Sequence, residues 1–268
     1  MSLSREQMLV EMGISPIWVT RDTVPPADER TASPLPAEPE PPAARGGAST
    51  PSIVPVVPTV AEAVPARADD KAKVEVGNLD WPALARQVAE CRACALCEQR
   101  KQAVLGVGDT NPDWLFIGEG PGSEEDARGE PFVGQAGKLL DNMLAALDIA
   151  RGNRVYIANA VKCRPPGNRT PEAAEIAACW PYLERQIALL KPKVIVLLGK
   201  AAVHAVLRDD KPLGGMRGKP YEFAGIPVVV TYHPAYLLRN LPDKAKAWED
   251  LLFARRILRE RAAPELPF

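Results

Sequence analysis

The stretch that decides the fold is "KVIVLLGKAAVHAVL", residues 193–207. Residues 193–199 form an apolar run that ends in a glycine, and we expect a strand that is buried on both faces in the centre of a sheet. Residues 200–207 have the composition of a helix that follows directly. A buried strand followed at once by a helix is typical of a parallel sheet whose connections are helical.

The same alternation continues on both sides of this stretch. Further strands are expected at residues 113–118, 155–161 and 227–232. Helical spacing of apolar residues predicts helices at 79–97, 136–150 and 170–190 and near the end of the chain. The sequence therefore predicts an α/β fold of three layers, α/β/α, around a central, mainly parallel four-stranded sheet. This domain is expected to span residues 76–268.

The chain before residue 76 has a different composition. Eleven of the 28 prolines in the full chain lie between Pro25 and Pro65, so we predict a disordered Pro/Ala-rich linker at residues 23–75. Residues 1–22 form a short amphipathic segment that is either a frayed terminus or a tethered peptide that docks on this protein or on a protein partner. We expect a cytoplasmic protein that does not enter a membrane, because the sequence has no apolar run of about 18 residues and no signal peptide at its start.

The five cysteines are spaced like metal ligands. Cys91 and Cys94 form a C-x-x-C pair, while Cys163 follows a predicted strand and Cys179 lies on the next helix. In a cytoplasmic protein, four such thiols favour zinc or an iron–sulfur cluster over disulfides, with four free thiols as the alternative. If the first helix continues to residue 97, Cys97 points away from Cys91, and we leave it out of the ligand set.

Polar stretches follow three of the predicted strands: "EGPGSEEDARGEPFVG" (119–134), "NAVKCRPPGNR" (159–169) and "YHPAYLLRN" (232–240). In a parallel sheet all three should meet at the carboxyl edge, where ligands bind. His233 is placed there by its strand. Arg164, Arg169 and Arg239 suit contacts with a nucleic-acid backbone, although ordinary solvated charge is the alternative. The glycine-rich turn "GEGPG" alone is weak evidence for phosphate binding.

Together these motifs closely resemble family 4 uracil-DNA glycosylases, bacterial and archaeal base-excision enzymes that carry a [4Fe-4S] cluster. The resemblance rests on "GEGPG", "PFVGQAGKLL", "NAVKCRPPGNR", "LGKAA", "HPAYLLRN" and the cysteines, and it covers roughly residues 85 to 260. It implies a [4Fe-4S] cluster on Cys91, Cys94, Cys163 and Cys179. It also implies that the chain, expected to be a monomer, removes uracil from single- and double-stranded DNA and leaves an abasic site.

The resemblance also implies roles for individual residues. Phe132 would stack on a flipped base, and Asn159 would read uracil through N3–H and O4. His233 would donate to uracil O2, and Glu119 would orient the attacking water or balance the cationic sugar. The alternatives are a core ring for Phe132, a strand-end cap for Asn159 and a carboxylate without chemical function for Glu119.

The remaining expectations concern the rim of the site and competing functions. Gly120 would lie against the substrate, and Glu125 would crowd the uracil C5 edge. Leu237 and Leu238 would form a wedge that fills the gap left by the extruded base, with Arg239 beside them. The other histidine of the chain, His204, is expected to be a core or surface residue. The competing functions are a non-catalytic iron–sulfur or zinc module that binds nucleic acid, and a nucleotide-phosphate binder.

Overall fold

The computed structural model describes residues 76–262 of the 268-residue chain. The N-terminal segment 1–22 and the linker 23–75 lie outside the described residues. Among the residues described, no helix is both long enough and apolar enough to cross a membrane.

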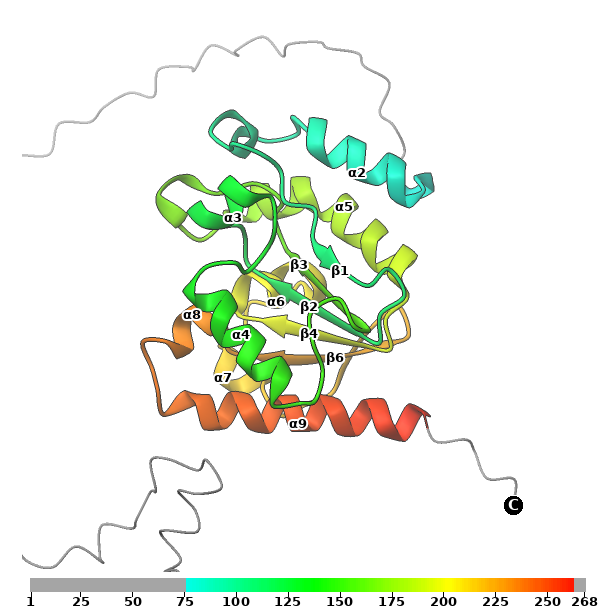
Figure 1. The fold of residues 1–268 in the computed structure, drawn as a ribbon, viewed down its shortest axis with the longest axis vertical. Helices are drawn as coiled ribbons and strands as arrows, with labels where there is room; N and C mark the ends of the chain where they lie inside the picture. Colours follow the sequence, from blue (N-terminus) through cyan, green and yellow to red (C-terminus); the bar gives the residue numbers. More distant parts are fainter. Residues whose placement is uncertain (1–75, 263–268) are drawn as a thin grey trace, which may run out of the picture. The chain divides into compact units, whose positions relative to one another are not determined.

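The centre of the domain is a six-stranded sheet with the strand order β1-β3-β2-β4-β6-β5 (Figure 1). Its inner strands β2 (Trp114–Gly118), β3 (Val155–Asn159), β4 (Val194–Leu198) and β6 (Ile226–Thr231) are parallel and match the four predicted strands. The prediction of four strands was incomplete, because two short strands, β1 (Val107–Gly108) and β5 (Tyr221–Phe223), add antiparallel edges.

The sequence gives only a weak signal for the two edge strands. β1 has two residues, one of them glycine, so it shows no apolar run. β5 joins β6 through a two-residue turn at Ala224 and Gly225, whose φ angles are 49° and 78°. Positive φ at both turn positions is the geometry of a tight hairpin, which usually carries Asn-Gly or Gly-Gly rather than Ala-Gly.

Helices cover both faces of the sheet. One face carries α2 (Trp81–Glu90), α5 (Ala173–Leu190) and α6 (Lys200–Leu207), and the other carries α4 (Gln135–Ala145) and α9 (Asp243–Ala262) (Figure 1). The shorter elements are α3 (Ser123–Arg128), α7 (Leu213–Met216), α8 (Pro234–Leu237) and the 3-10 turns η2 (Val76–Asn78), η3 (Ala95–Glu98) and η4 (Pro166–Asn168).

Alternate residues of each inner strand enter two separate cores. In β4, Ile195 and Leu197 pack toward α5, whereas Val194, Val196 and Leu198 pack toward α4 and α9. All five side chains are fully buried. This two-sided burial explains the continuous apolar run of residues 194–198 and confirms the predicted α/β/α layers.

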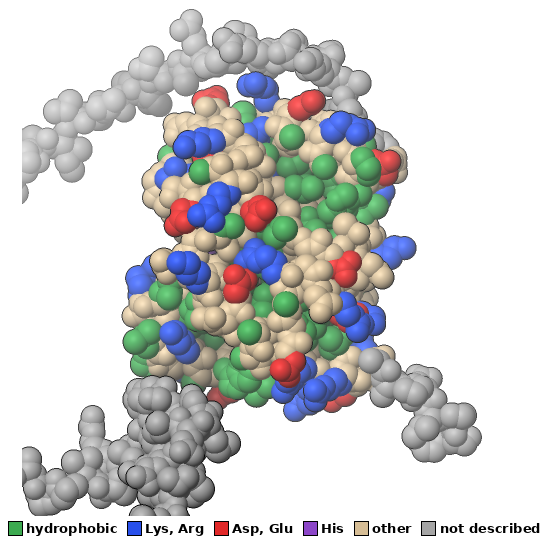
Figure 2. Space-filling view, viewed as in Figure 1, with side chains coloured by type: hydrophobic (Ala, Val, Ile, Leu, Met, Phe, Trp, Pro, Cys, Tyr) green, Lys and Arg blue, Asp and Glu red, His purple; other side chains and the backbone are tan. Residues whose placement is uncertain are grey.

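The surface charge is mixed. The face in Figure 2 shows Lys and Arg side chains interspersed with Asp and Glu, in keeping with the net charge of −1 for the whole chain. On this face, contacts with an anionic partner therefore depend on individual side chains rather than on a large field of one sign.

The first helix is shorter than predicted. It begins, as expected, after the N-cap Asp80, whose carboxylate accepts a hydrogen bond of 2.9 Å from the amide of Ala83. It ends at Glu90 instead of residue 97, and Cys91 is already extended with ψ 135°. The C-x-x-C pair therefore lies in a loop, and the helical argument that set Cys97 apart from Cys91 is wrong.

Deleting residues 1–75 is expected to shift the midpoint of thermal unfolding by no more than about 4 °C, the effect of about 1 kcal/mol in a domain of this size. The reason is that the sheet and both cores lie after residue 75. The control is a deletion of residues 1–90, which also removes the buried Leu84 and Val88 and should lower the midpoint strongly. Similar losses for both deletions in differential scanning calorimetry would contradict this expectation.

Candidate active site

A cleft of about 670 Å³ opens at the carboxyl edge of the sheet, where β2, β3 and β6 end. It brings together most of the residues predicted from the sequence. The predicted residues that line it are Glu119, Gly120, Glu125, Phe132, Asn159, Arg169, His233 and Arg239. Arg164, Leu237 and Leu238 are not part of its lining.

Asn159 provides an unpaired polar atom at this cleft. It is the last residue of β3, it is 2% exposed, and its Oδ1 has no hydrogen-bond partner within the described part of the chain. Gly118 lies opposite it on β2, and a Cβ atom at Gly118 would collide with both Asn159 Oδ1 and the Phe132 ring. Since an unpaired buried acceptor costs about 1–3 kcal/mol, this oxygen is suited to a donor brought by a ligand.

Phe132 has its ring in the cleft and a strained backbone. Its φ angle is +56°, which is unusual for a bulky residue. The ring is 5% exposed and stacks against the His233 imidazole, with 5.4 Å between the ring centroids and 29° between the planes. The aromatic ring and the Asn159 amide therefore lie side by side at the cleft, because both lie next to Gly118.

His233 is held in one orientation at the N-terminus of α8. Its Nδ1 accepts a hydrogen bond of 3.1 Å from the amide of Ala235, so the proton of a neutral ring lies on Nε2. Burial lowers the pKa of His233 to about 4, and the charge of Arg239 acts in the same direction while Glu125 opposes it. At neutral pH the ring is therefore an uncharged donor.

Glu119 follows β2 directly and lies at the same cleft. Burial raises the pKa of its carboxyl group, while a hydrogen bond with the side chain of Thr170 acts in the opposite direction. Gly120 is closely packed, because a Cβ atom there would lie 2.8 Å from Val161 Cγ2. A carboxylate and a closely packed backbone thus line the cleft at the end of β2.

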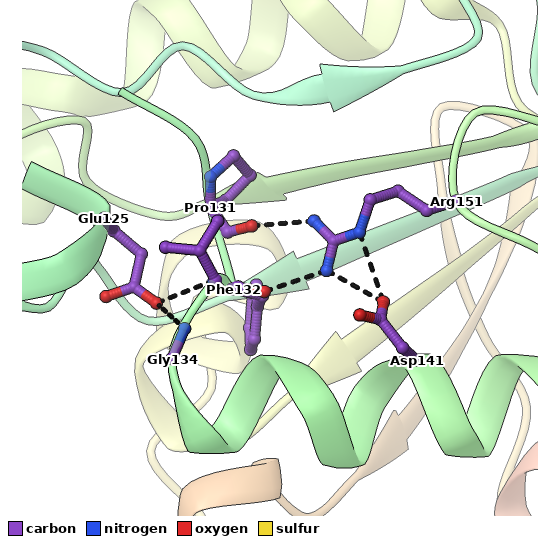
Figure 3. A network of polar contacts seen from close by, with 7 residues as sticks. Glu125, Pro131, Phe132, Gly134, Asp141 and Arg151 are labelled. Carbon is purple, nitrogen blue, oxygen red and sulfur yellow. Dashed lines mark hydrogen bonds and ion pairs between the residues drawn. The ribbon is translucent and has the colours of Figure 1, made fainter. Parts of the chain in front are cut away.

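Glu125 lines the cleft, and its carboxylate is bound by the backbone. Its carboxylate accepts a hydrogen bond of 3.0 Å from the amide of Gly122. It also accepts from the amides of Val133 and Gly134 at 2.9 and 3.0 Å (Figure 3). Both oxygens are therefore engaged by the backbone, which does not favour a role at the C5 edge of a base. The residue instead ties the start of α3 to the loop that carries Phe132.

The three predicted basic residues differ in their availability. The guanidinium of Arg169 donates to both carboxylate oxygens of Glu175, at 2.9 and 2.6 Å, and Arg164 Nε donates to Asn168 Oδ1 at 2.7 Å. Arg239 is exposed, and it forms no ion pair within the described residues. It is therefore the best placed of the three to meet an anionic ligand.

The two leucines of the predicted wedge are not equivalent. Leu237 is 1% exposed, because the single turn of α8 directs it into the interior, so it belongs to the core. Leu238 is 42% exposed, and Leu241, which the sequence analysis missed, is 60% exposed. Among the described residues these two are the exposed large hydrophobic side chains, and both lie on the segment that follows α8.

All five cysteines line a second cavity, together with Arg100 and Lys162. Among the residues described, no three His, Cys, Asp or Glu side chains converge as the ligands of a single metal ion do. Hydrogen bonds reach the sulfur atoms of three cysteines: Arg100 Nη1 donates to Cys163 at 2.9 Å, the amide of Lys162 to Cys179 at 3.3 Å, and the amide of Ala93 to Cys91 at 3.5 Å. Burial raises the pKa of the Cys163 and Cys179 thiols, while the contacts of Arg100 with Cys163 and of Lys162 with Cys179 act in the opposite direction, toward the thiolate form that metals bind.

Lys162 connects this cavity to the cleft. Its side chain is 2% exposed, and its Nζ donates a hydrogen bond of 2.9 Å to the backbone carbonyl of Asn159. This internal contact was not expected from the sequence. Nothing in the residues that neighbour Lys162 could have indicated it.

The low pKa of His233 makes stability dependent on pH. Between its ordinary pKa of about 6.5 and its folded pKa of about 4, the unfolded chain binds a proton that the folded chain does not. Stability that is fully present above pH 6.5 is therefore lost as the pH falls toward 4, by at most about 3 kcal/mol. Urea denaturation at pH 7 and pH 4 should show this loss in the native protein and a smaller one in His233→Gln.

The control is His204→Gln. His204 lies on α6 outside the cleft and pairs with Asp210 at 2.8 Å, as expected for a surface histidine. His204→Gln should lose as much stability between pH 7 and pH 4 as the native protein does. An identical pH dependence of the native protein and His233→Gln would show that His233 is not held neutral.

Comparison with known proteins places the chain in a family. The model of the uracil DNA glycosylase superfamily matches residues 105–252. A type-4 uracil-DNA glycosylase of Pyrobaculum aerophilum is 42% identical over 181 residues, which are 65% of this chain and 92% of that relative. One of Thermotoga maritima is 41% identical over 66% of this chain and 94% of its own length. A type-5 enzyme of Pyrobaculum aerophilum is 32% identical over 50% of this chain and 66% of its own length. The chain therefore belongs to the uracil-DNA glycosylase superfamily, and within it to the type-4 family.

Proposed function

We propose that this chain is a uracil-DNA glycosylase that hydrolyses the N-glycosidic bond of uracil in DNA during base-excision repair. The observation that carries the proposal is the unpaired, buried Asn159 Oδ1 beside the Phe132 ring and the neutral His233. The relatives named as type-4 uracil-DNA glycosylases support it. Monomeric state and cytoplasmic location remain predictions.

Base recognition follows from the atoms available. Uracil must leave the base stack to reach the cleft, and the Phe132 ring offers it a new stacking surface. Asn159 Oδ1 accepts from uracil N3–H, and its amide nitrogen donates to O4. Cytosine presents an acceptor and a donor in the reverse positions, so both contacts would fail, and unpaired buried groups cost about 1–3 kcal/mol each.

Bond cleavage uses the other two residues. As the bond between C1′ and N1 breaks, its electron pair moves onto uracil, and His233 Nε2–H donates to the negative charge that develops on O2. The sugar becomes cationic, and water attacks C1′. Glu119 is placed to orient this water and to balance the charge of the sugar. The products are free uracil and an abasic site.

Asn159→Asp is expected to lower the single-turnover excision of uracil by about 100-fold or more, because a carboxylate cannot donate to O4 and repels it. The assay uses uracil-containing single-stranded DNA followed by alkaline cleavage. Asn153→Asp is the matched control, since Asn153 is exposed before the start of β3 and lies outside the cleft. Binding to undamaged DNA should change little in either variant.

The competing function is a non-catalytic module that binds nucleic acid. Such a module would bind uracil-containing DNA without releasing uracil, and Asn159→Asp would have no rate to change. Absence of excision by the native, metal-loaded protein would therefore contradict the proposal and favour this alternative.

We also infer that Cys91, Cys94, Cys163 and Cys179 hold a [4Fe-4S] cluster. These four cysteines line one common cavity, and four thiolates are the ligand set of a [4Fe-4S] cluster, the cofactor that the resemblance to family 4 enzymes implies. When bound, the cluster would supply structural cross-linking. The chain's own residues already link this cavity to the cleft through Lys162, so the ligand loop and Asn159 are expected to be ordered together.

Protein purified without oxygen should be brown and contain about four irons per chain. Cys163→Ser should lose most of this iron, because Cys163 is buried and bound by Arg100. Cys97→Ser should keep the iron and the colour. Iron analysis and visible absorption measure both. One zinc per chain in a colourless active protein, or bleaching by Cys97→Ser, would contradict the assignment.

The DNA wedge is revised to Leu238, with Leu241 beside it, since these are the exposed leucines at this position. Leu238→Ala should reduce excision from paired DNA several-fold more than from single strands, because only paired DNA requires unpairing and unstacking, at a cost of a few kcal/mol. Leu237→Ala is the contrast, since Leu237 is buried and its loss should lower thermal stability. Equal duplex-to-single-strand rate ratios in Leu238→Ala and the native protein would exclude the wedge.

A further inference from the structure

We propose that Arg151 is a positioning residue that holds Phe132 in the conformation required for stacking on the flipped base. This inference rests on the proposed function of Phe132 in uracil excision. Arg151 lies in the connection between α4 and β3, and neither it nor its partner Asp141 lines the cleft. Any effect of Arg151 on the reaction must therefore pass through other residues.

Arg151 binds the backbone on both sides of the Phe132 peptide unit. Its Nη1 donates to the carbonyl of Pro131 at 2.8 Å, and its Nη2 donates to the carbonyl of Phe132 at 2.9 Å (Figure 3). The guanidinium is itself fixed by Asp141 on α4, whose Oδ1 accepts from Nε at 3.2 Å and from Nη2 at 2.9 Å. A planar fork with several donors can make all these contacts at once, whereas the single ammonium of a lysine cannot.

The opposite side of the loop is fixed as well. The Glu125 carboxylate accepts from the amides of Val133 and Gly134, the two residues that follow Phe132 (Figure 3). The Phe132 carbonyl lies against Gly137 on α4, where a Cβ atom would collide with it. The carbonyl of Phe132 therefore lies between α4 and the Arg151 guanidinium, and the amides that follow it are tied to α3.

The contacts of Arg151 and Glu125 with the backbone around Phe132 form a clamp. This clamp explains why Phe132 keeps a left-handed backbone. With φ at +56°, a bulky residue is strained and relaxes to an ordinary conformation unless its surroundings prevent it. Relaxation would rotate the peptide unit and move the ring away from His233 and Asn159, its neighbours at the cleft. The Arg151–Asp141 ion pair is partly exposed. The Arg151 guanidinium nevertheless donates to two carbonyl oxygens, of Pro131 and Phe132, which this backbone conformation brings together.

The test is a double-mutant cycle on the full-length, metal-loaded protein. Arg151→Met keeps the length of the side chain and removes the donors. It should lower the single-turnover rate of uracil excision about 10-fold, within the range expected for loss of one stacking contact. In the Phe132→Ala background the same change should have almost no further effect, because Arg151 acts through that ring.

Arg154→Met is the matched control. Arg154 lies in the same connection and is ion-paired with Asp113, so its replacement removes the same charge without touching the Phe132 loop. It should leave the excision rate close to that of the native protein. Asp141→Asn, which loosens the clamp from outside, takes the place of Arg151→Met in the cycle if that variant does not fold.

The outcomes separate the two proposals. Equal rate losses from Arg151→Met with and without the Phe132 ring would overturn the positioning role, as would a native rate in Arg151→Met. A native protein that releases no uracil would instead overturn the proposed function. Non-additive losses, with the control unchanged, would establish the clamp.

Discussion

Parallel pairing of β2, β3, β4 and β6 is the constraint on which the rest of the structure depends. Because parallel strands all end at the same edge, the loops after β2, β3 and β6 meet there without any long-range contact of their own. Glycines at two strand ends then allow side chains to approach. Gly118 leaves room for the Phe132 ring and the Asn159 amide, and Gly199, with φ +92°, packs against Cβ of His233.

The site is arranged before any substrate is present. A buried acceptor without a partner and a phenylalanine in a strained backbone each reduce stability, and a histidine kept neutral reduces it below about pH 6.5. The surrounding structure offsets these costs through the Glu125 and Arg151 contacts and the rigid sheet. This is the arrangement expected for a site that stabilises charge in a transition state, because its donors need no reorganisation during the reaction.

The sequence was informative where burial or spacing leaves a pattern. The inner strands were predictable because both of their faces are apolar, and the positions of His233 and Asn159 were predictable because they lie at the carboxyl ends of those strands. Contacts with the backbone leave no such pattern. Arg151 and Lys162 bind carbonyl groups, and nothing in their neighbouring residues indicates this. The end of α2 at Glu90 and the burial of Leu237 likewise depend on how one turn packs, which is a tertiary effect.

The chemistry of the cleft depends on a neutral histidine whose Nε2 proton can be donated to the departing base. The chain has two histidines, so nitrogen-15 NMR of histidine-labelled protein, assigned with His204→Gln, reads the state of His233 directly. We expect an Nε2–H tautomer at pH 6 that remains uncharged until the pH approaches 4. A cationic ring at pH 6, or a proton on Nδ1, would contradict it.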